Sequence, residues 1–232
     1  MELHGQSFNA IHVGAAWGSL ARMRGAGGRG ADGEIIQRLQ ALTRAKVPEM
    51  GARQVANILY AMAKMHARGR KVGDDDLEEE LLARAVATAG DFNPQNVANL
   101  LWALATMGSK ADARLLEWAL ATMGSKADAR LLEAMQGRAT ATAGDFNPQN
   151  VGNLLWALAC LDTPHSQVSG LMVESMAVRL LSVREQLSVE NKSQMHQWLL
   201  CCDLHHEWRV KLPRSMQKVK EELGDAFRQA FA

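Results

Sequence analysis

A long stretch of this chain occurs twice, and that repeat limits the folds open to it more than any other feature. DFNPQNVANLLWALATM at 91–107 returns as DFNPQNVGNLLWALA at 145–159, and the 16-residue segment WALATMGSKADARLLE is present in tandem between them, at 102–117 and 118–133. Once the tandem copy is set aside, weaker copies recur every 38–42 residues. The units begin near Ser7, Glu49, Asp91, Asp145 and Leu187. Such a chain is expected to be an array of about five similar units.

Each unit has the pattern of two helices. In the third unit Asn93 is a favourable N-cap, Pro94 suits the first helical turn, and Gly108 is typical of a helix end. The apolar residues between them recur at three and four positions, which predicts one buried stripe: Val97, Leu100, Leu101, Leu104 and Met107. A second helix is expected from about Asp128, and no stretch alternates in the manner of a strand. Helix pairs repeated at this period predict an all-α fold, an α-solenoid of stacked helical-hairpin repeats.

The tandem copy adds one helix-length segment, from Ala111 to about Met123, to the third unit. An odd helix reverses the up-and-down order of an alternating stack, so we expect a bulged extra helix or a joint in the solenoid near 108–126. The repeat array is then predicted to span 1–204. The remainder, 205–232, carries apolar residues on one side of a helix and charges of both signs on the other. That pattern predicts an amphipathic helix that caps the array.

The pattern FNPQNVANLLWALATMG, with its shortest spacing of 38 residues, resembles the octotricopeptide repeat. This α-solenoid module belongs to organellar RNA-binding proteins that are related to the FAST-kinase-like and RAP-domain proteins. The resemblance implies sequence-specific binding of single-stranded RNA and a role in RNA processing, mRNA stability or translation. It also implies the mitochondrial matrix or the chloroplast stroma, and other proteins of a ribonucleoprotein complex as partners. No strand-rich segment follows Leu204, so we expect the RAP domain to be lacking.

Comparison of the units with one another nominates residues that would contact RNA. A repeat that reads one base per unit needs side chains that vary on a constant frame. The position of Asn96 varies and is polar, and we predict that its occupants in the first four units contact base edges: His12, Gln54, Asn96 and Asn150. Three cations are predicted to contact phosphates or stack on bases: Arg22, Lys64 and Lys192. The alternative is that all of these residues form a solvated helix face.

Other repeated positions are interpreted as structural. The repeated asparagines are Asn57, Asn99 and Asn153. We expect them to satisfy backbone groups between neighbouring helices, because buried polar groups are normally paired. Trp102 and Trp156 belong to the repeat itself, and we align Trp198 with them in the fifth unit. That alignment places Lys192 opposite Asn150.

The balance of charge offers no strong attraction for RNA. The chain has 26 Lys and Arg against 25 Asp and Glu, a formal net charge of +1. Binding of RNA would therefore need positive charge to be gathered on one face. The alternative function is a protein–protein interaction scaffold of the HEAT or armadillo kind. The sequence has no phosphate-binding loop, nucleophile elbow or oriented acid–base pair, so we expect no enzyme, no cofactor and no small-molecule substrate.

Three further features are assigned no site. The soft ligands of the fifth unit lack a second spaced pair, so no metal is expected there: His196, Cys201, Cys202, His205 and His206. Gly25–Gly33 is expected to be a loop, and the acidic run 74–80 a solvated helix start. No apolar run is long enough to span a membrane. The opening MELHGQSFNA is unlike a transit peptide, so we expect the chain to be a fragment of a longer product.

Overall fold

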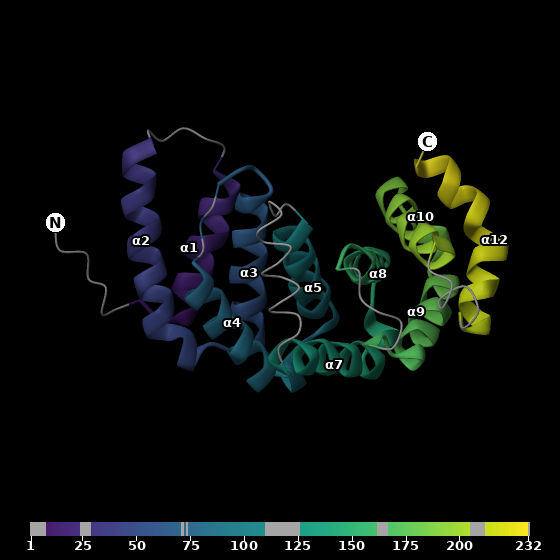
Figure 1. The fold of residues 1–232 in the computed structure, drawn as a ribbon, viewed down its shortest axis with the longest axis horizontal. Helices are drawn as coiled ribbons and strands as arrows, with labels where there is room; N and C mark the ends of the chain where they lie inside the picture. The colour runs from purple at the N-terminus through teal and green to yellow at the C-terminus, as the bar shows by residue number, and fades with distance from the viewer. Residues whose placement is uncertain are drawn as a thin grey trace.

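The structure is a computed structural model that describes residues 8–23, 29–70, 72, 74–109, 126–161, 167–204 and 212–231. Every regular element in these ranges is a helix, which confirms the all-α prediction. The helices follow one another along the long axis of the molecule, from α1 and α2 at one end to α10 and α12 at the other (Figure 1).

The helices form two layers, which we call A and B. The A helices are α1 (Ala10–Arg22), α3 (Ala52–His66), α5 (Pro94–Ser109), α8 (Pro148–Cys160) and α10 (Val189–Leu204). The B helices are α2 (Arg29–Lys46), α4 (Asp75–Ala87), α7 (Lys126–Ala141), α9 (Gly170–Ser182) and α12 (Arg214–Phe231). Each A helix packs on its A neighbours and on the B helix that follows it, and each B helix contacts the next one. This stack of A–B pairs is the solenoid that the repeat predicted.

A side-chain capping contact begins α1, α5, α8 and α10 and explains the repeated FNxxN pattern, whereas α3 begins after Gly51 without one. In α5 the Asn93 side chain accepts the backbone N–H of Asn96 at 2.8 Å, and Asn96 Oδ1 accepts the N–H of Asn93 at 3.5 Å. Ser188 and Asn191 exchange the same two bonds at 3.2 Å in α10. This capping box satisfies N–H groups that have no partner inside the helix. Phe92, just before the N-cap, is fully buried and fixes where the chain enters the helix.

An arginine of the B layer ties each central unit together. Its Nε donates to the backbone carbonyl of the residue that precedes the N-cap of the A helix in the same unit. The pairs are Arg84–Met50, Arg138–Phe92 and Arg179–Phe146, with Nε–O distances of 2.6, 2.5 and 2.6 Å. In the first unit Leu42 stands at the corresponding position and packs against the core. The tie therefore distinguishes the central units from the first one.

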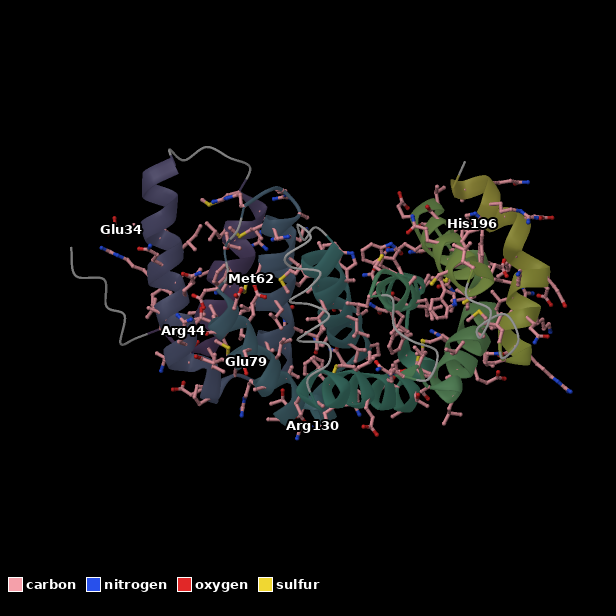
Figure 2. All side chains as sticks on the ribbon, viewed as in Figure 1. Glu34, Arg44, Met62, Glu79, Arg130 and His196 are labelled. Carbon is pink, nitrogen blue, oxygen red and sulfur yellow. The ribbon has the colours of Figure 1, made fainter. Side chains whose placement is uncertain are left out.

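The apolar core lies between the two layers. Met62 of α3 is almost fully buried, whereas Glu34, Glu79 and Arg130 lie on exposed sides of B helices (Figure 2). Trp17 is also fully buried, and its indole N–H donates to Thr43 Oγ1 at 2.9 Å. That bond holds α1 on α2 and satisfies a polar group that burial would otherwise leave without water.

The fifth unit differs from the sequence alignment by one residue. Ser188 caps α10 as Asn147 caps α8, so Asn191, and not Lys192, corresponds to Asn150. Aligning the units by tryptophan was wrong here. Trp198 is 2% exposed and faces the core, whereas Trp156 is half-buried on the outer side of its helix.

Two helix boundaries also differ from prediction. α2 begins at Arg29, inside the predicted Gly25–Gly33 loop, and α5 continues through Gly108 to Ser109. Glycine costs only about 1 kcal/mol in a helix, which packing readily offsets. The predicted extra helix and the joint near 108–126 fall largely outside the described residues.

α12 packs on both α9 and α10, in the place that a B helix occupies in the other units. Among the described residues, no group of three or more His, Cys, Asp or Glu is placed to hold a metal ion. His196, Cys201 and Cys202 lie in α10, while His205 and His206 are outside the described ranges. In the part of the chain searched, no helix combines the length and apolar character that crossing a membrane requires.

Candidate nucleic-acid interface

One side of the A layer faces away from the B helices, and we call it the A face. It consists of the second, sixth, ninth and thirteenth residues of each A helix, a spacing that keeps side chains on one side of a helix. The second-residue row is Ile11, Arg53, Gln95, Gln149 and Glu190, and the sixth-residue row is Ala15, Asn57, Asn99, Asn153 and Gln194. The ninth-residue row is Gly18, Tyr60, Trp102, Trp156 and Gln197, and the thirteenth-residue row is Arg22, Lys64, Thr106, Cys160 and Cys201. All of these except Asn153 and Thr106 are exposed or half-buried.

An aromatic row runs along the middle of the A face. The ring centroids of Tyr60 and Trp102 are 4.9 Å apart, and those of Trp102 and Trp156 are 6.4 Å apart with an interplanar angle of 29°. All three side chains are half-buried, so each ring keeps part of its surface open to solvent. Burial also raises the pKa of the Tyr60 hydroxyl above its usual value, which keeps the phenol neutral. Rings placed in this way on successive helices are a platform on which nucleobases can stack.

Among the described residues, acidic side chains lie in the B helices, in the loops and 3-10 helices between the layers, and in α10. The helices α1, α3, α5 and α8 contain no Asp or Glu at all. Several cations of the B layer and its loops pair with carboxylates, and others bond to backbone carbonyls. The pairs include Arg38 with Glu34, Arg44 with Asp74, Lys46 with Glu49 and Lys218 with Glu222. The small net charge therefore conceals a segregation by layer, which is the condition that RNA binding requires of a near-neutral chain.

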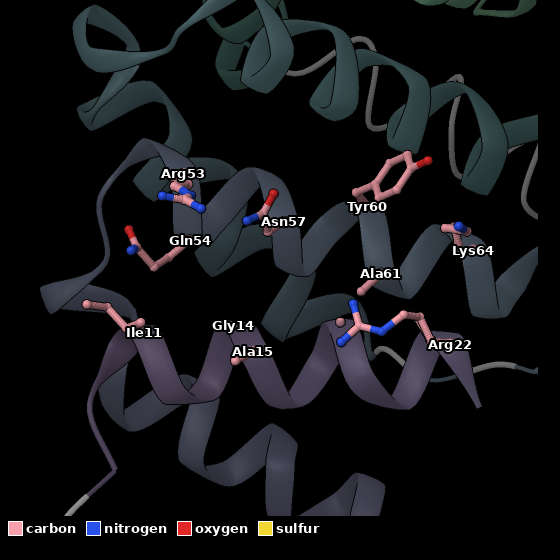
Figure 3. Close-up of a pocket in the computed structure, with 12 residues that line it drawn as sticks. Ile11, Gly14, Ala15, Arg22, Arg53, Gln54, Asn57, Tyr60, Ala61 and Lys64 are labelled. Carbon is pink, nitrogen blue, oxygen red and sulfur yellow. The ribbon is translucent and has the colours of Figure 1, made fainter.

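Three cations of the A face gather between α1 and α3. Arg22, Arg53 and Lys64 line one groove of about 570 Å³ (Figure 3). None of them contacts a carboxylate among the described residues; Arg22 donates to Ser19 Oγ at 3.1 Å, and Lys64 Nζ lies 5.5 Å from the centroid of the Tyr60 ring. The α1 side of the groove is formed largely by small residues: Gly14, Ala15, Gly18 and Ala21. Arginine and lysine without acidic partners, in a groove without acidic lining, favour a phosphate-bearing ligand.

The opposite end of the A face is closed by a network of side-chain amides between α8 and α10. Gln149 Nε2 and Gln194 Nε2 both donate to Asn153 Oδ1, at 2.7 and 3.0 Å. Asn191 Nδ2 donates to Gln149 Oε1 at 3.0 Å. These amides satisfy one another's hydrogen-bonding groups, and together they cover the surface between α8 and α10.

The structure places the four predicted base readers at the third residue of their helices. His12, Asn96 and Asn150 each take part in capping: the backbone N–H of each donates to the N-cap asparagine, at 3.0, 2.8 and 2.8 Å. Asn96 and Asn150 are only 5% and 6% exposed, so their amides do not reach the A face. His12 is exposed beside Phe8, and Gln54 is half-buried in the groove between α1 and α3.

The three residues predicted to contact phosphates also lie in different parts of the structure. Arg22 and Lys64 lie together in the groove, whereas Lys192 lies on α10 near the other end of the array. Arg53, Gln95 and Gln149 were not nominated, although they stand at an exposed position of their helices. The signal was present in the sequence: this position varies between units as the neighbouring one does. Only the capping role of the neighbouring position shows which of the two faces outward.

The repeated asparagines become progressively more enclosed along the array. Asn57 is exposed, Asn99 half-buried and Asn153 only 9% exposed. Asn153 does join neighbouring helices, but its described partners are the side-chain amides of Gln149 and Gln194 and not the backbone groups that we expected.

Two stretches of the chain, 67–101 and 125–155, match the model of a family described as a protein of unknown function (DUF1601). The stretches are structurally equivalent. The first contains α4, a short 3-10 helix (Ala89–Asp91) and the first half of α5, and the second contains α7, the 3-10 helix Ala143–Asp145 and the first half of α8. No curated protein matches the chain. The family model therefore identifies the repeat as a B helix followed by an A helix, and it assigns no activity.

Proposed function

We propose that the A face binds single-stranded RNA, as an α-solenoid without catalytic activity of its own. The observation that carries this proposal is the coincidence of three features on one surface. The helices α1, α3, α5 and α8 have no acidic residue, a row of rings crosses three of them, and cations without carboxylate partners flank that row. A solvated face with no ligand would have no physical reason to combine these features.

Each feature has a role in the proposed complex. Bases stack on Tyr60, Trp102 and Trp156, and such stacking contributes about 1–3 kcal/mol per base. Arg22, Arg53 and Lys64 contact phosphates, as arginine and lysine commonly do. The amides of Gln54 and Gln95 donate to and accept from base edges, whereas the amide of Gln149 is engaged with Asn153 and Asn191. Asn96 and Asn150 hold helix starts in place and support these contacts only indirectly.

The resemblance to the octotricopeptide repeat supports organellar transcripts as the class of RNA, and the mitochondrial matrix or the chloroplast stroma as the place. Sequencing the RNA that copurifies with the chain from cells tests this part. Enrichment of transcripts made inside an organelle supports it, and enrichment of cytosolic transcripts contradicts it.

The binding itself is tested by fluorescence anisotropy with a randomised single-stranded RNA pool, at about 50 and about 200 mM KCl, because phosphate contacts make affinity fall steeply with salt. The informative pair of variants is Arg53→Gln, on the A face, and Arg38→Gln, an exposed arginine of α2 that pairs with Glu34. We expect Arg53→Gln to weaken binding and to reduce the slope of log K against log salt by about 0.7, the value for one phosphate contact with a single strand. Arg38→Gln should leave both unchanged.

Equal effects of the two substitutions would contradict the assignment to the A face. An absence of binding even at low salt would contradict RNA as the ligand altogether. The ringed and amide-rich middle of the A face would then favour the alternative, a scaffold that grips an extended peptide.

A further inference from the structure

The groove between α1 and α3 exists because the aromatic row stops one helix short of the end of the array. The ninth residue is Tyr60 in α3, Trp102 in α5 and Trp156 in α8, and each ring contacts the next. In α1 the ninth residue is Gly18, which presents no side chain to Tyr60. Tyr60 therefore has a ring neighbour on the α5 side, and its ring points away from α1 in Figure 3. Tyr60 is also among the residues that line the open groove between α1 and α3.

We propose that this groove binds a single nucleotide of the RNA strand, whose base stacks on Tyr60 in the place of the missing ring of α1. The proposal rests on the proposed function, because it specifies how one end of the bound strand is held. A base is a flat aromatic group, and every base has a face that can stack on a tyrosine. The bound base would extend the aromatic row to α1, whose ninth residue, Gly18, has no ring.

The size and charge of the groove fit this occupant. Its volume of about 570 Å³ lies within the roughly 300–1,000 Å³ typical of small-molecule sites. Arg22 lies at one end of the groove with Lys64, and Arg53 lies at the other end with Gln54 (Figure 3). Lys64 Nζ lies over the Tyr60 ring, 5.5 Å from its centroid. The ammonium group therefore moves aside when a base stacks on that ring, and it stays within reach of the phosphate on the ribose of the same nucleotide.

Polar groups that can recognise the base are also present. Gln54 and Asn57 line the groove on the same side as Tyr60, and neither side chain makes a hydrogen bond recorded among the described residues. Carboxamides bond to base edges through one donor and one acceptor group. No acidic side chain lines the groove to repel the phosphate. The first join of the array is therefore the place where a strand can be anchored by base, edge and phosphate at once.

The chain contains one tyrosine, and this makes the proposal directly measurable. Protein made with 3-fluorotyrosine carries a single ¹⁹F label, at Tyr60. Adenosine 5′-monophosphate is the probe, with adenosine and inorganic phosphate as its separate halves. We expect the monophosphate to shift the ¹⁹F signal in a saturable way, and adenosine to bind at least about 5-fold more weakly because it lacks the contacts of the charged phosphate.

Two variants separate the groove from the rest of the A face. Gly18→Trp fills the empty place in the row and should abolish the effect of the monophosphate; a Cβ at Gly18 meets only Arg22 Nη1, at 3.5 Å, so the backbone accepts a side chain. Arg22→Gln replaces an exposed side chain at the Lys64 end of the groove, and it should weaken the monophosphate about 5-fold or more while leaving adenosine unchanged. The second variant keeps the test decisive if the first one fails to fold.

The possible failures are distinguishable. If the RNA pool binds in the anisotropy titration but the monophosphate never shifts the Tyr60 signal, the nucleotide site is refuted and the RNA-binding function stands. If the monophosphate shifts the signal but no RNA binds at low salt, the groove takes a free nucleotide, and both the RNA function and this proposal are contradicted.

Discussion

The first and last joins between neighbouring A helices are built on the same frame and filled differently. Between α1 and α3 the surface is an open groove that has small residues on the α1 wall and cations on both walls, Arg22 on α1 and Arg53 and Lys64 on α3. Between α8 and α10 the same face is closed by amides that bond to one another. The frame of the A layer is set by buried apolar stripes and, in every A helix except α3, by an N-cap side chain. It leaves the outward residues of each join free to differ.

The third type of join lies between these two. From α3 through α5 to α8, the outward surface is filled by rings that contact one another. Charge changes along the same direction: the thirteenth residue of the A helices is Arg22, then Lys64, Thr106, Cys160 and Cys201. The A face is thus basic and open at its N-terminal end, aromatic in the middle, and closed at its C-terminal end, where Glu190 is exposed on α10.

The largest effect is expected where an aromatic join is opened. Trp102→Ala removes a ring that contacts both Tyr60 and Trp156. We expect a loss of about 2–3 kcal/mol in the free energy of unfolding, less than for a fully buried tryptophan because Trp102 is half-buried. Urea unfolding followed by circular dichroism measures this. Trp156→Ala, which removes a ring with a single ring neighbour, should cost less; an equal or larger loss would show that the row does not act as a continuous contact.

A slightly smaller effect on stability is expected when the arginine that ties a central unit together is replaced by leucine, the residue at the corresponding position of the first unit. Arg179→Leu removes the bond to the Phe146 carbonyl and places in α9 the residue type that α2 carries at Leu42. A hydrogen bond from a charged donor contributes about 1.5–3 kcal/mol, so we expect a loss of that size in urea unfolding. Arg184→Leu, at an exposed arginine in the loop that follows α9, is the matched control and should change stability by less than about 0.5 kcal/mol.

Charge can be moved to the neutral end of the A face. Cys160→Lys extends the row of Arg22 and Lys64 onto α8, at an exposed position. We expect RNA affinity to rise and the salt slope to steepen by about 0.7, as for one added phosphate contact. Cys160→Gln, which adds polarity without charge, should alter neither quantity. An unchanged slope with lysine would mean that the strand does not extend as far as α8.

A matched pair of glycines compares the two joins most closely. Gly14 of α1 and Gly152 of α8 occupy the same position in their helices. A Cβ at Gly14 meets nothing within 4 Å, whereas one at Gly152 comes within 2.5 Å of Gln194 Oε1. Gly14→Ala should therefore stabilise the fold by about 0.5–1 kcal/mol through helix propensity. Gly152→Ala should gain less than that or lose stability, because the amide network must move. Thermal unfolding of the two variants side by side decides the matter.

The smallest effect concerns the thiol at the neutral end. Cys160 is exposed in part, but the neighbouring atoms that desolvate its thiol, together with the nearby Cys201, raise its pKa from 9.0 to about 11. Its labelling by iodoacetamide, followed by mass spectrometry of the peptide, should rise roughly tenfold per pH unit from pH 8 until about pH 11, because the thiolate is the nucleophile. The folded state holds this proton more tightly than the unfolded chain, so the contribution to stability is present below about pH 9 and is lost as pH rises through about 11. A plateau near pH 9 would contradict the shift.

The sequence was sufficient for the fold because its signals are local. The period, the N-cap asparagines and the apolar stripe of Val97 to Met107 each act within one helix, and together they predict the helix pairs and their stacking. The predicted alignment of the fifth unit was wrong by one residue, because it was based on Trp198, which is more conspicuous in the sequence than Ser188. Only the capping contacts show that Trp198 is a core residue and that the unit must be aligned on its serine.

The candidate site was predicted only in part, for a related reason. Arg22 and Lys64 were found because a cation on a helix stripe is visible in sequence. Asn96 and Asn150 were chosen because they vary as a reader should, yet a helix N-terminus uses the same polar residues for capping. The groove could not be predicted from the sequence. It depends on the absence of a side chain at Gly18 of α1, beside Tyr60 on the neighbouring helix α3. Contacts between units depend on residues of two neighbouring repeats, so they cannot be predicted from the pattern of one repeat.

The central claim is that the A face, and not the B layer, contacts RNA. The most direct test is ultraviolet cross-linking of the chain to single-stranded RNA that contains 4-thiouridine, followed by mass spectrometry of the modified peptides. We expect adducts in the peptides of α3, α5 and α8, centred on Tyr60, Trp102 and Trp156. Adducts concentrated in α4, α7 or α12, or spread evenly over both layers, would contradict the account.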